Sequence, residues 1–406
     1  MFTKIQIIFQ VTRNVCTFAF RNATPSEKKL MKRLLTIPII IALILAINIK
    51  SFSQNTRKID IALCLDLSAS TNGLIDKFRE AIWQILNETN KLSPTPEIRI
   101  GLVAYGRPSY GRSSYFVKVM SDLTDDVDGF YEGIIGIHAM IEAGESYVGK
   151  AMECTINKMS WSKDPDALKF IFLIGNGPVN MGGMDYQDQS DFAVSKGIFL
   201  TPVFVKNYLK PSEEMGWEKI AQLAKTNYEQ LNINKKLQQI PTSFDEDVLK
   251  ELNKVLDSTY LYYGQNGKSR YKFMQNLDND AARISLDCFQ ERIAYKSSPS
   301  FQMKQSSWDL VDWSYLPVTD YDLVNNGYLP EKLQNKSDED LRRIVRATRY
   351  QRAQAIKSIK EISQKRQQVI ATKSAQLKIN NNDTFAGIII NTIKRIAGQN
   401  GFTALN

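Results

Sequence analysis

The stretch IDIALCLDLSAS, residues 59–70, decides how the rest of this sequence is interpreted. Residues 59–65 are rich in apolar and β-branched side chains, are too few for a helix and are flanked by polar residues, which is typical of a central strand in a parallel sheet. The loop after such a strand lies at its carboxyl end, the edge where open α/β sheets bind ligands. This loop supplies Asp66, Ser68 and Ser70, whose carboxylate and hydroxyl oxygens are ligands of the kind that Mg²⁺ prefers. A plainer role is also open, because either serine could cap the helix that follows.

The chain after this loop alternates between strand and helix patterns. An amphipathic helix is predicted over residues 73–92. Further strands are predicted at residues 98–105, 114–124, 168–175, 197–206 and 228–233. The strand ending at Thr124 is predicted at an edge, Thr124 is predicted to cap the next helix, and Pro202 favours an edge or late position for its strand. The predicted fold class is α/β, a doubly wound and mostly parallel sheet over residues 54–237.

The D-x-S-x-S motif after a buried strand, together with this order of strands and helices, resembles the metal-ion-dependent adhesion site of von Willebrand A-type (vWA) domains. The resemblance implies two further metal-binding loops, with a Thr after the second helix and an Asp after the fourth strand. Glu145 and Ser146, in GESYVGK, take the first place here, and Asn176 takes the second. The implied ligands are Asp66, Ser68, Ser70, Glu145, Ser146 and Asn176, and the implied cation is Mg²⁺, with Mn²⁺ or Ca²⁺ as substitutes. Because few of these ligands are anionic, we expect weak cation binding.

The sequence also resembles bacterial secreted proteins with one vWA domain near the N-terminus and a helical C-terminal extension, through FIFLIGN, MDYQD and SSWDLVD. The resemblance implies a non-enzymatic protein whose vWA domain binds an acidic residue of a protein partner through the cation. An envelope scaffold with a degenerate metal site is the alternative. Fold alone does not decide between them.

Other chemistries have little support in the sequence. Residues 144–151 differ by one position from a phosphate-binding P-loop, but Ala151 lacks the hydroxyl that binds Mg²⁺, and the preceding segment is predicted to be helix rather than strand. His138, the one histidine, is predicted on a helix, and no G-x-S-x-G elbow accompanies it. The three cysteines after residue 53 are irregularly spaced, which predicts buried thiols rather than a zinc or redox site. A glycosidase built from carboxylates alone stays open.

The net charge of +9 is concentrated at the front of the chain. Residues 1–53 hold eight of the 52 Lys and Arg and one of the 43 acidic residues, so the rest is nearly neutral and we expect no nucleic-acid partner. MKR, LLTIPIIIALILAI and SFS, within residues 31–53, have the three regions of a secretory signal, which makes residues 1–30 a mis-called start. The apolar stretch, residues 34–47, is shorter than the roughly 20 residues that span a bilayer. We therefore expect a cleaved signal, a periplasmic or secreted protein, and no integral membrane protein.

The remaining chain is predicted to be mainly helical. Residues 238–336 have mixed helix and loop patterns, and residues 337–378 form one long basic helix that starts with a capping box at Ser337 and Asp340. Arg352 and Arg366 interrupt its apolar stripe, so a coiled coil is not indicated. Its basic face predicts either solvation or contact with an anionic envelope component or glycan. A last helix, within residues 379–406, is expected to dock on the body.

Overall fold

The computed structural model describes residues 57–404 except 139–140, 207–212, 236–239, 241–245, 303, 317–320, 322–323, 325 and 381. The described residues belong to one compact unit, Thr56–Asn406. The predicted secretory signal and the predicted domain boundary at residue 237 lie outside them. None of the helices in this described part is both long enough and apolar enough to cross a membrane.

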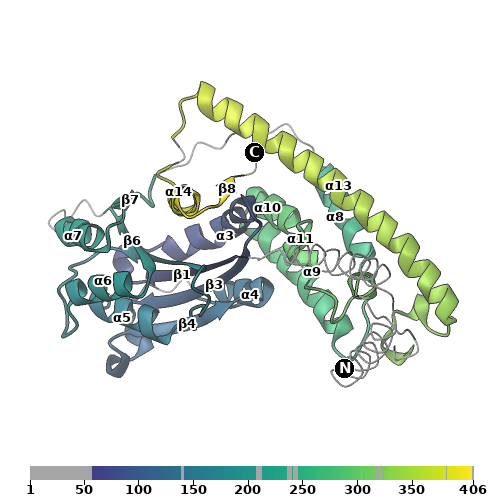
Figure 1. The fold of residues 1–406 in the computed structure, drawn as a ribbon, viewed down its shortest axis with the longest axis horizontal. Coiled ribbons are helices and arrows are strands. Elements are labelled where there is room, and N and C mark those ends of the chain that lie inside the picture. The colour runs from purple at the N-terminus through teal and green to yellow at the C-terminus, as the bar shows by residue number, and fades with distance from the viewer. Residues whose placement is uncertain are drawn as a thin grey trace, which may run out of the picture. The chain divides into compact units, whose positions relative to one another are not determined.

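A six-stranded sheet has the order β4-β3-β1-β5-β6-β7 (Figure 1). Its strands are β1 (Lys58–Asp66), β3 (Glu97–Tyr105), β4 (Val117–Thr124), β5 (Leu168–Gly175), β6 (Ile198–Val205) and β7 (Glu229–Leu231). The edge strand β4 is antiparallel to β3, and all other neighbours are parallel. The chain winds outward from β1 in both directions, so the predicted doubly wound α/β class is confirmed and the fold is vWA-like.

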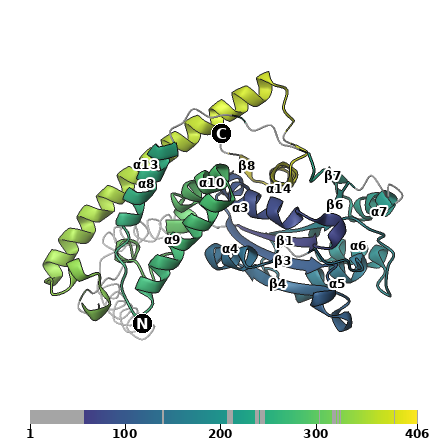
Figure 2. The same cartoon turned by 180° about the vertical axis from the view of Figure 1, so that it is seen from behind.

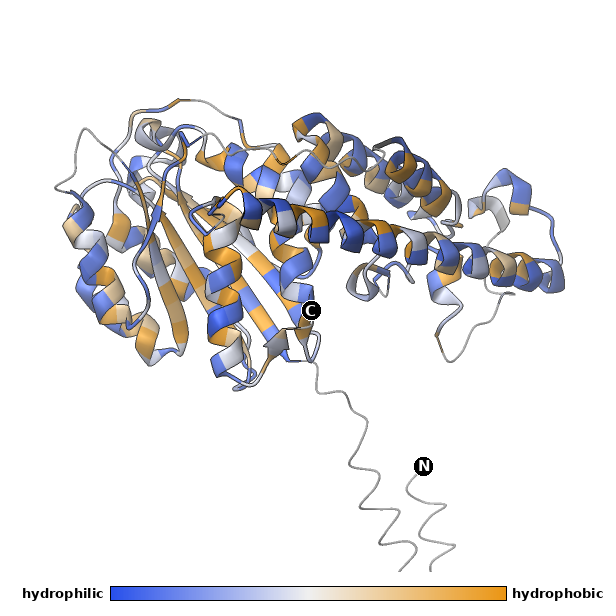
Figure 3. Cartoon of the chain, turned by 90° about the horizontal axis from the view of Figure 1, so that it is seen from above, coloured by the Kyte–Doolittle hydropathy of each residue, from blue (hydrophilic) through white to orange (hydrophobic). Residues whose placement is uncertain are grey.

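Helices cover both faces of this sheet. The helices are α3 (Leu74–Asn90) and α4 (Val127–Ile135) on one face, and α5 (Val148–Lys158), α6 (Tyr186–Ser195) and α7 (Glu214–Ala224) on the other. Alternate residues of β1 enter the two cores, with Ile61 and Leu63 in one and Ala62 and Cys64 in the other. Figure 3 accordingly shows largely hydrophobic strands in the sheet. Burial on both faces explains the continuous apolar run in the sequence.

A helical region follows β7. It contains α8 (Glu246–Ser258), α9 (Gly267–Ile284), α10 (Leu286–Lys296), α11 (Pro299–Gln302), α12 (Leu310–Trp313) and α13 (Asp338–Gln376). The long helix α13 packs against α8, α10 and α12. Figure 2 shows α8 beside it. Ser337 caps it by accepting a hydrogen bond from the Asp340 N–H, as predicted.

The two arginines predicted to interrupt the apolar stripe of α13 belong to its packed face. Arg352 is buried and donates from one nitrogen to Asp309 at 2.6 Å and to Asp312 at 2.7 Å. Arg366 is buried and donates to Glu291 at 2.9 Å. Charged side chains can be buried when they are paired with opposite charges. The packed face of α13 is therefore continuous, although it contains arginines as well as apolar residues.

The chain then returns to the sheet. The helix α14 (Phe385–Gln399) packs against α3 and β5, on the same face of the sheet as α3. The short strand β8 (Thr403–Ala404) pairs with β2 (Leu92–Ser93), which directly follows α3. The last helix therefore completes the cover of one face, after some 150 residues of intervening chain.

One local prediction needs correction. Asp126, and not Thr124, caps α4, and it accepts a hydrogen bond from the Gly129 N–H. For the strand that contains Pro202, an edge or a late position was predicted, and the late position is observed, because only β7 lies beyond β6 in the sheet. The pairing with β7 covers only Val203–Val205, so Pro202 lies beside an unpaired stretch of that side of β6.

Candidate functional site

Three loops at the carboxyl edge of the sheet bring five of the six predicted ligands together. Asp66 ends β1, Ser68 and Ser70 lie in the next loop, Ser146 precedes α5, and Asn176 follows β5. The Ser146 hydroxyl donates to Asp66 Oδ2 at 2.8 Å, and the Ser68 and Ser70 hydroxyl oxygens are 2.9 Å apart. The Ser70 hydroxyl donates to Asn176 Oδ1 at 2.7 Å. The Ser68 backbone N–H joins these two sets by donating to Asp66 Oδ1, so the five residues form a single hydrogen-bonded group, although they come from distant parts of the sequence.

The carboxylate of Asp66 is the charged member of this group and is fully buried. Burial raises its pKa to about 6, although hydrogen bonds from Ser68, Ser146 and the Asn176 N–H oppose the shift. The Ser68 N–H donates to Asp66 Oδ1 at 2.9 Å. A buried carboxylate whose charge is stabilised only by neutral donors would gain from a nearby cation.

We expect the cation-free protein to lose stability as the pH rises from about 4 to above 6. The pKa of Asp66 is about 6 in the folded protein against 3.8 for an ordinary solvated aspartate, so the folded state keeps this proton over that window. Protonated Asp66 makes its full contribution to stability below the pKa that it has in the unfolded chain. This contribution is lost as the pH rises through the pKa that it has in the folded protein, and the difference is about 3 kcal/mol. Urea unfolding in metal-free buffer measures this. Asp66→Asn should remove the component, and an unchanged pH profile in that variant would contradict the assignment.

A second buried carboxylate, that of Asp312, titrates in the same pH range, and it is present in both the wild type and the Asp66→Asn variant. Burial raises the pKa of Asp312 to about 7, with Arg352 acting in the opposite direction. Because Asp312 is present in both proteins, the difference between them isolates Asp66.

The capping role considered for the two serines is not observed. Ser68 stands at the start of the short 3-10 helix Ala69–Thr71 but makes no side-chain cap hydrogen bond, and α3 begins after Gly73. The hydroxyls of Ser68 and Ser70 face each other instead. They remain available as oxygen ligands.

Glu145 is the predicted ligand that the structure does not bring into the group. Its side chain is exposed and accepts a hydrogen bond from the Tyr147 hydroxyl. Its neighbour Ser146 is buried and contacts Asp66. The loop therefore contributes a hydroxyl rather than a second carboxylate.

Gly106 and Arg107, which follow β3, belong to the site and were not predicted. A Cβ atom at Gly106, which has a φ of +86°, would lie 2.6 Å from Asp66 Oδ1 and 3.3 Å from Ser146 Oγ. The buried Arg107 donates to the Leu67 carbonyl at 2.8 Å and to the His138 carbonyl at 2.9 Å, which joins the loops around Asp66. A glycine directly after a central strand was the available signal, because it permits a close backbone approach.

The five grouped side chains fit a hard divalent cation. All of them offer oxygen atoms, and the hydroxyl rotors can turn their lone pairs toward an ion. Asp66 is the single anionic ligand of the five, and among the described residues no three His, Cys, Asp or Glu side chains come together. Low charge in the ligand set predicts weak binding.

The other motifs have structural roles. Residues 141–147 are loop and α5 begins at Val148, so the P-loop-like segment follows neither a strand nor the predicted helix. His138 also lies in a loop, after α4, and is exposed. Cys64, Cys154 and Cys288 are buried free thiols, as predicted.

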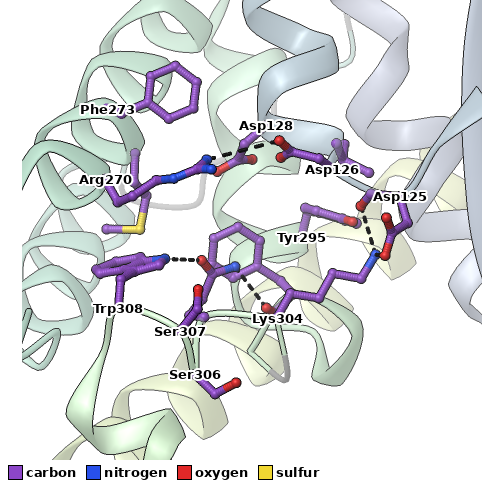
Figure 4. A pocket seen from close by; sticks show the side chains of 14 residues that line it. Asp125, Asp126, Asp128, Arg270, Phe273, Tyr295, Lys304, Ser306, Ser307 and Trp308 are labelled. Atoms are coloured by element: carbon purple, nitrogen blue, oxygen red, sulfur yellow. Dashed lines mark hydrogen bonds and ion pairs between the residues drawn. The ribbon is translucent and has the colours of Figure 1, made fainter. Parts of the chain in front are cut away.

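A hollow of about 420 Å³ lies between the start of α4 and the helices α9 to α11 (Figure 4). Three ion pairs border it: Asp125–Lys304 at 3.1 Å, Asp126–Arg270 at 4.0 Å and Asp128–Arg292 at 2.5 Å. In Figure 4 the side chains of Lys304 and Arg270 reach across toward the aspartates. Because the opposite charges are matched, we assign the hollow to the contact between α4 and the helical region rather than to an ion site.

Comparison with known proteins gives structural similarities only. No protein-family model matches the sequence, and no curated protein matches it. The conserved hypothetical protein BatB from Bacteroides thetaiotaomicron is 15% identical, with 49% of this chain and 98% of that chain covered and a TM-score of 0.33. Proximal thread matrix protein 1 from the mussel byssus, solved with a zinc-occupied MIDAS motif, is 19% identical over 44% of this chain and 43% of that chain, with a TM-score of 0.35. The SpRpn10 VWA domain is 13% identical over 45% of this chain and 91% of that chain, with a TM-score of 0.34.

Proposed function

We propose that this vWA-fold protein is exported and binds an acidic residue of a protein partner through a divalent cation. Asp66, Ser68, Ser70, Ser146 and Asn176 would hold the cation. The observation that supports this most directly is their convergence into one hydrogen-bonded group at the ligand-binding edge of the sheet. Mg²⁺ is the proposed ion because every donor is a hard oxygen.

Asp66 and Ser70 have different roles in the proposed site. Asp66 is fully buried and supplies the negative charge, while Ser70, which bonds to both Ser68 and Asn176, is exposed to solvent. A bound cation would supply the electrostatic attraction for a partner's carboxylate. We propose a binding role for these residues and no catalytic step.

Titration with Mg²⁺ alone is the first test. We expect Mg²⁺ in the millimolar range to release or absorb heat and to raise the melting temperature, because a ligand that binds only the folded state stabilises it by RT ln(1 + [L]/Kd). Asp66→Ala should abolish both effects. Asp191→Ala, at an exposed position on α6, is the matched control and should behave as the wild type. Pull-down from envelope extract should then retain a partner in Mg²⁺ and lose it in chelator or with Asp66→Ala. Retention under all three conditions would rule out the metal mechanism.

The alternative function is an envelope scaffold with a degenerate metal site. Two buried polar contacts attach the helical region to the helices of the vWA-like sheet and favour it: the ion pair between Arg292 and Asp128, and the hydrogen bond that Asn87 donates to Glu291. Absence of heat and of a thermal shift with Mg²⁺ would support the scaffold. Under either function, the basic face of α13 would contact an anionic component of the envelope.

A further inference from the structure

The long helix α13 carries a straight row of exposed basic side chains. The row consists of Arg342, Arg346, Arg349, Lys357 and Lys360. At about 100° per residue these positions return to the same side of the helix, and the row extends for roughly 27 Å. The helix is more polar than the sheet over most of its length (Figure 3).

Most of this row has no opposite charge nearby. Among the described residues, no carboxylate lies within ion-pair distance of Arg342, Arg346, Arg349 or Lys360, and Lys357 approaches Glu361 only at 4.0 Å. Like charges three and four residues apart on a helix repel each other. Repulsion within the row therefore lowers the stability of the free protein, and an anionic partner would reduce this repulsion.

Two of the arginines are held in place by tyrosine rings. The Arg349 guanidinium carbon lies 3.6 Å from the centre of the Tyr315 ring, and the Arg342 guanidinium carbon lies 4.7 Å from the centre of the Tyr321 ring. Stacking occupies the flat face of a guanidinium and leaves its N–H edges free for phosphate oxygens. Less side-chain entropy is then lost when a phosphate binds.

Exposed apolar side chains accompany this row. Tyr350, one residue after Arg349, is 69% exposed, Tyr315 is 56% exposed and Leu316 is 46% exposed. Tyrosine is enriched at the interface of a bilayer, where its ring and its hydroxyl find different surroundings. A surface that combines arginines with exposed tyrosines suits phospholipid headgroups better than a fully hydrated polyanion.

We propose that this face of α13 docks the protein peripherally on a bilayer that contains anionic phospholipids. The inference deepens the anionic-partner part of the proposed function and does not depend on the metal site. Another side of α13 is packed against α8, α10 and α12, so the helix meets a partner only through its outer ridge. The side chains of the row are exposed on the outside of the helix, where a flat surface can reach them, whereas single-stranded nucleic acids bind in grooves.

Vesicle sedimentation in chelator tests this docking with residues 54–406, which contain the whole compact unit. The vesicles are phosphatidylcholine with or without phosphatidylglycerol. We expect binding only to the anionic vesicles, and loss of binding at high salt. Replacing Arg346, Lys357 and Lys360 together by Gln should weaken binding about a hundredfold, at about 1 kcal/mol for each charge near the surface. Replacing the exposed Lys158, Lys163 and Lys219 of the sheet domain by Gln changes the net charge equally and should leave binding nearly unchanged.

Three outcomes would overturn the docking site. They are equal binding to both kinds of vesicle, equal loss in the two triple variants, and tighter binding of single-stranded DNA than of anionic vesicles at the same salt concentration. Because the assay contains chelator, failure of docking leaves the Mg²⁺ titration of Asp66 unaffected, and the two proposals can fail separately.

Discussion

Replacing Arg292 by methionine is expected to lower the free energy of unfolding by about 3–5 kcal/mol. Arg292 of α10 is fully buried and bonds to Asp128 of α4 at 2.5 Å and to Asp278 of α9 at 3.0 Å. Its guanidinium carbon also lies 4.5 Å from the centre of the Trp83 ring. Without the Arg292 guanidinium, the largely buried carboxylates of Asp128 and Asp278 would lie close together with less positive charge to balance them. The contact between the sheet and the helical region would then weaken. Denaturant unfolding measures the loss.

Two further variants separate this effect from a loss of packing. Arg283→Met removes an arginine of α9 whose side chain is 79% exposed and pairs with Asp280, so it should cost no more than about 1 kcal/mol. Adding Asp128→Asn to Arg292→Met should restore part of the stability, because one stranded charge disappears. A loss at Arg292 as small as that at Arg283 would contradict the assigned role.

Asn176→Asp is expected to tighten cation binding by about tenfold or more, which corresponds to a gain of roughly 1–2 kcal/mol. Asn176 is 1% exposed, and its Oδ1 atom accepts a hydrogen bond from Ser70, so a carboxylate there would give the site a second negative charge. At about 4 Å and an effective dielectric near 20, a unit charge pair is worth roughly 4 kcal/mol before desolvation and carboxylate repulsion are subtracted. Calorimetric titration with Mg²⁺ measures the change.

The same substitution should act in the opposite direction without a cation. The Asn176 amide donates to the Ser70 carbonyl at 3.3 Å, and aspartate would replace this donor by an oxygen. Two carboxylates would also face each other unscreened, so the melting temperature should fall in chelator and rise in Mg²⁺. Identical shifts under both conditions would mean that Asn176 is not at a cation site.

The sheet could be predicted from the sequence because its strands are buried on both faces. Runs such as residues 59–65 and 168–175 then contain almost only apolar residues, and each ends in a loop at the same edge. Asp66 and Asn176 were predicted to be close for this reason. The order of strands and loops along the sequence was sufficient to predict this proximity.

The parts that could not be predicted depend on side-chain direction or on distant partners. Glu145 and Ser146 are adjacent, and only the backbone course of their loop decides which of them faces Asp66. Arg352 looked like an interruption because its partners, Asp309 and Asp312, lie about 40 residues away. Helical periodicity contains no information about such pairs.

The return of the chain to the sheet has a consequence for the order in which the protein matures. A ribosome would release the strands and α3 well before α14 and β8, so the face around Phe78 would stay uncovered while the helical region was still being made. Domains tend to fold during synthesis when their own residues are complete, and this one stays incomplete until residue 404 has emerged. For the export proposed above, such a delay would keep the nascent chain unfolded enough to pass through a translocation channel, and the covering of that apolar face would complete folding after passage.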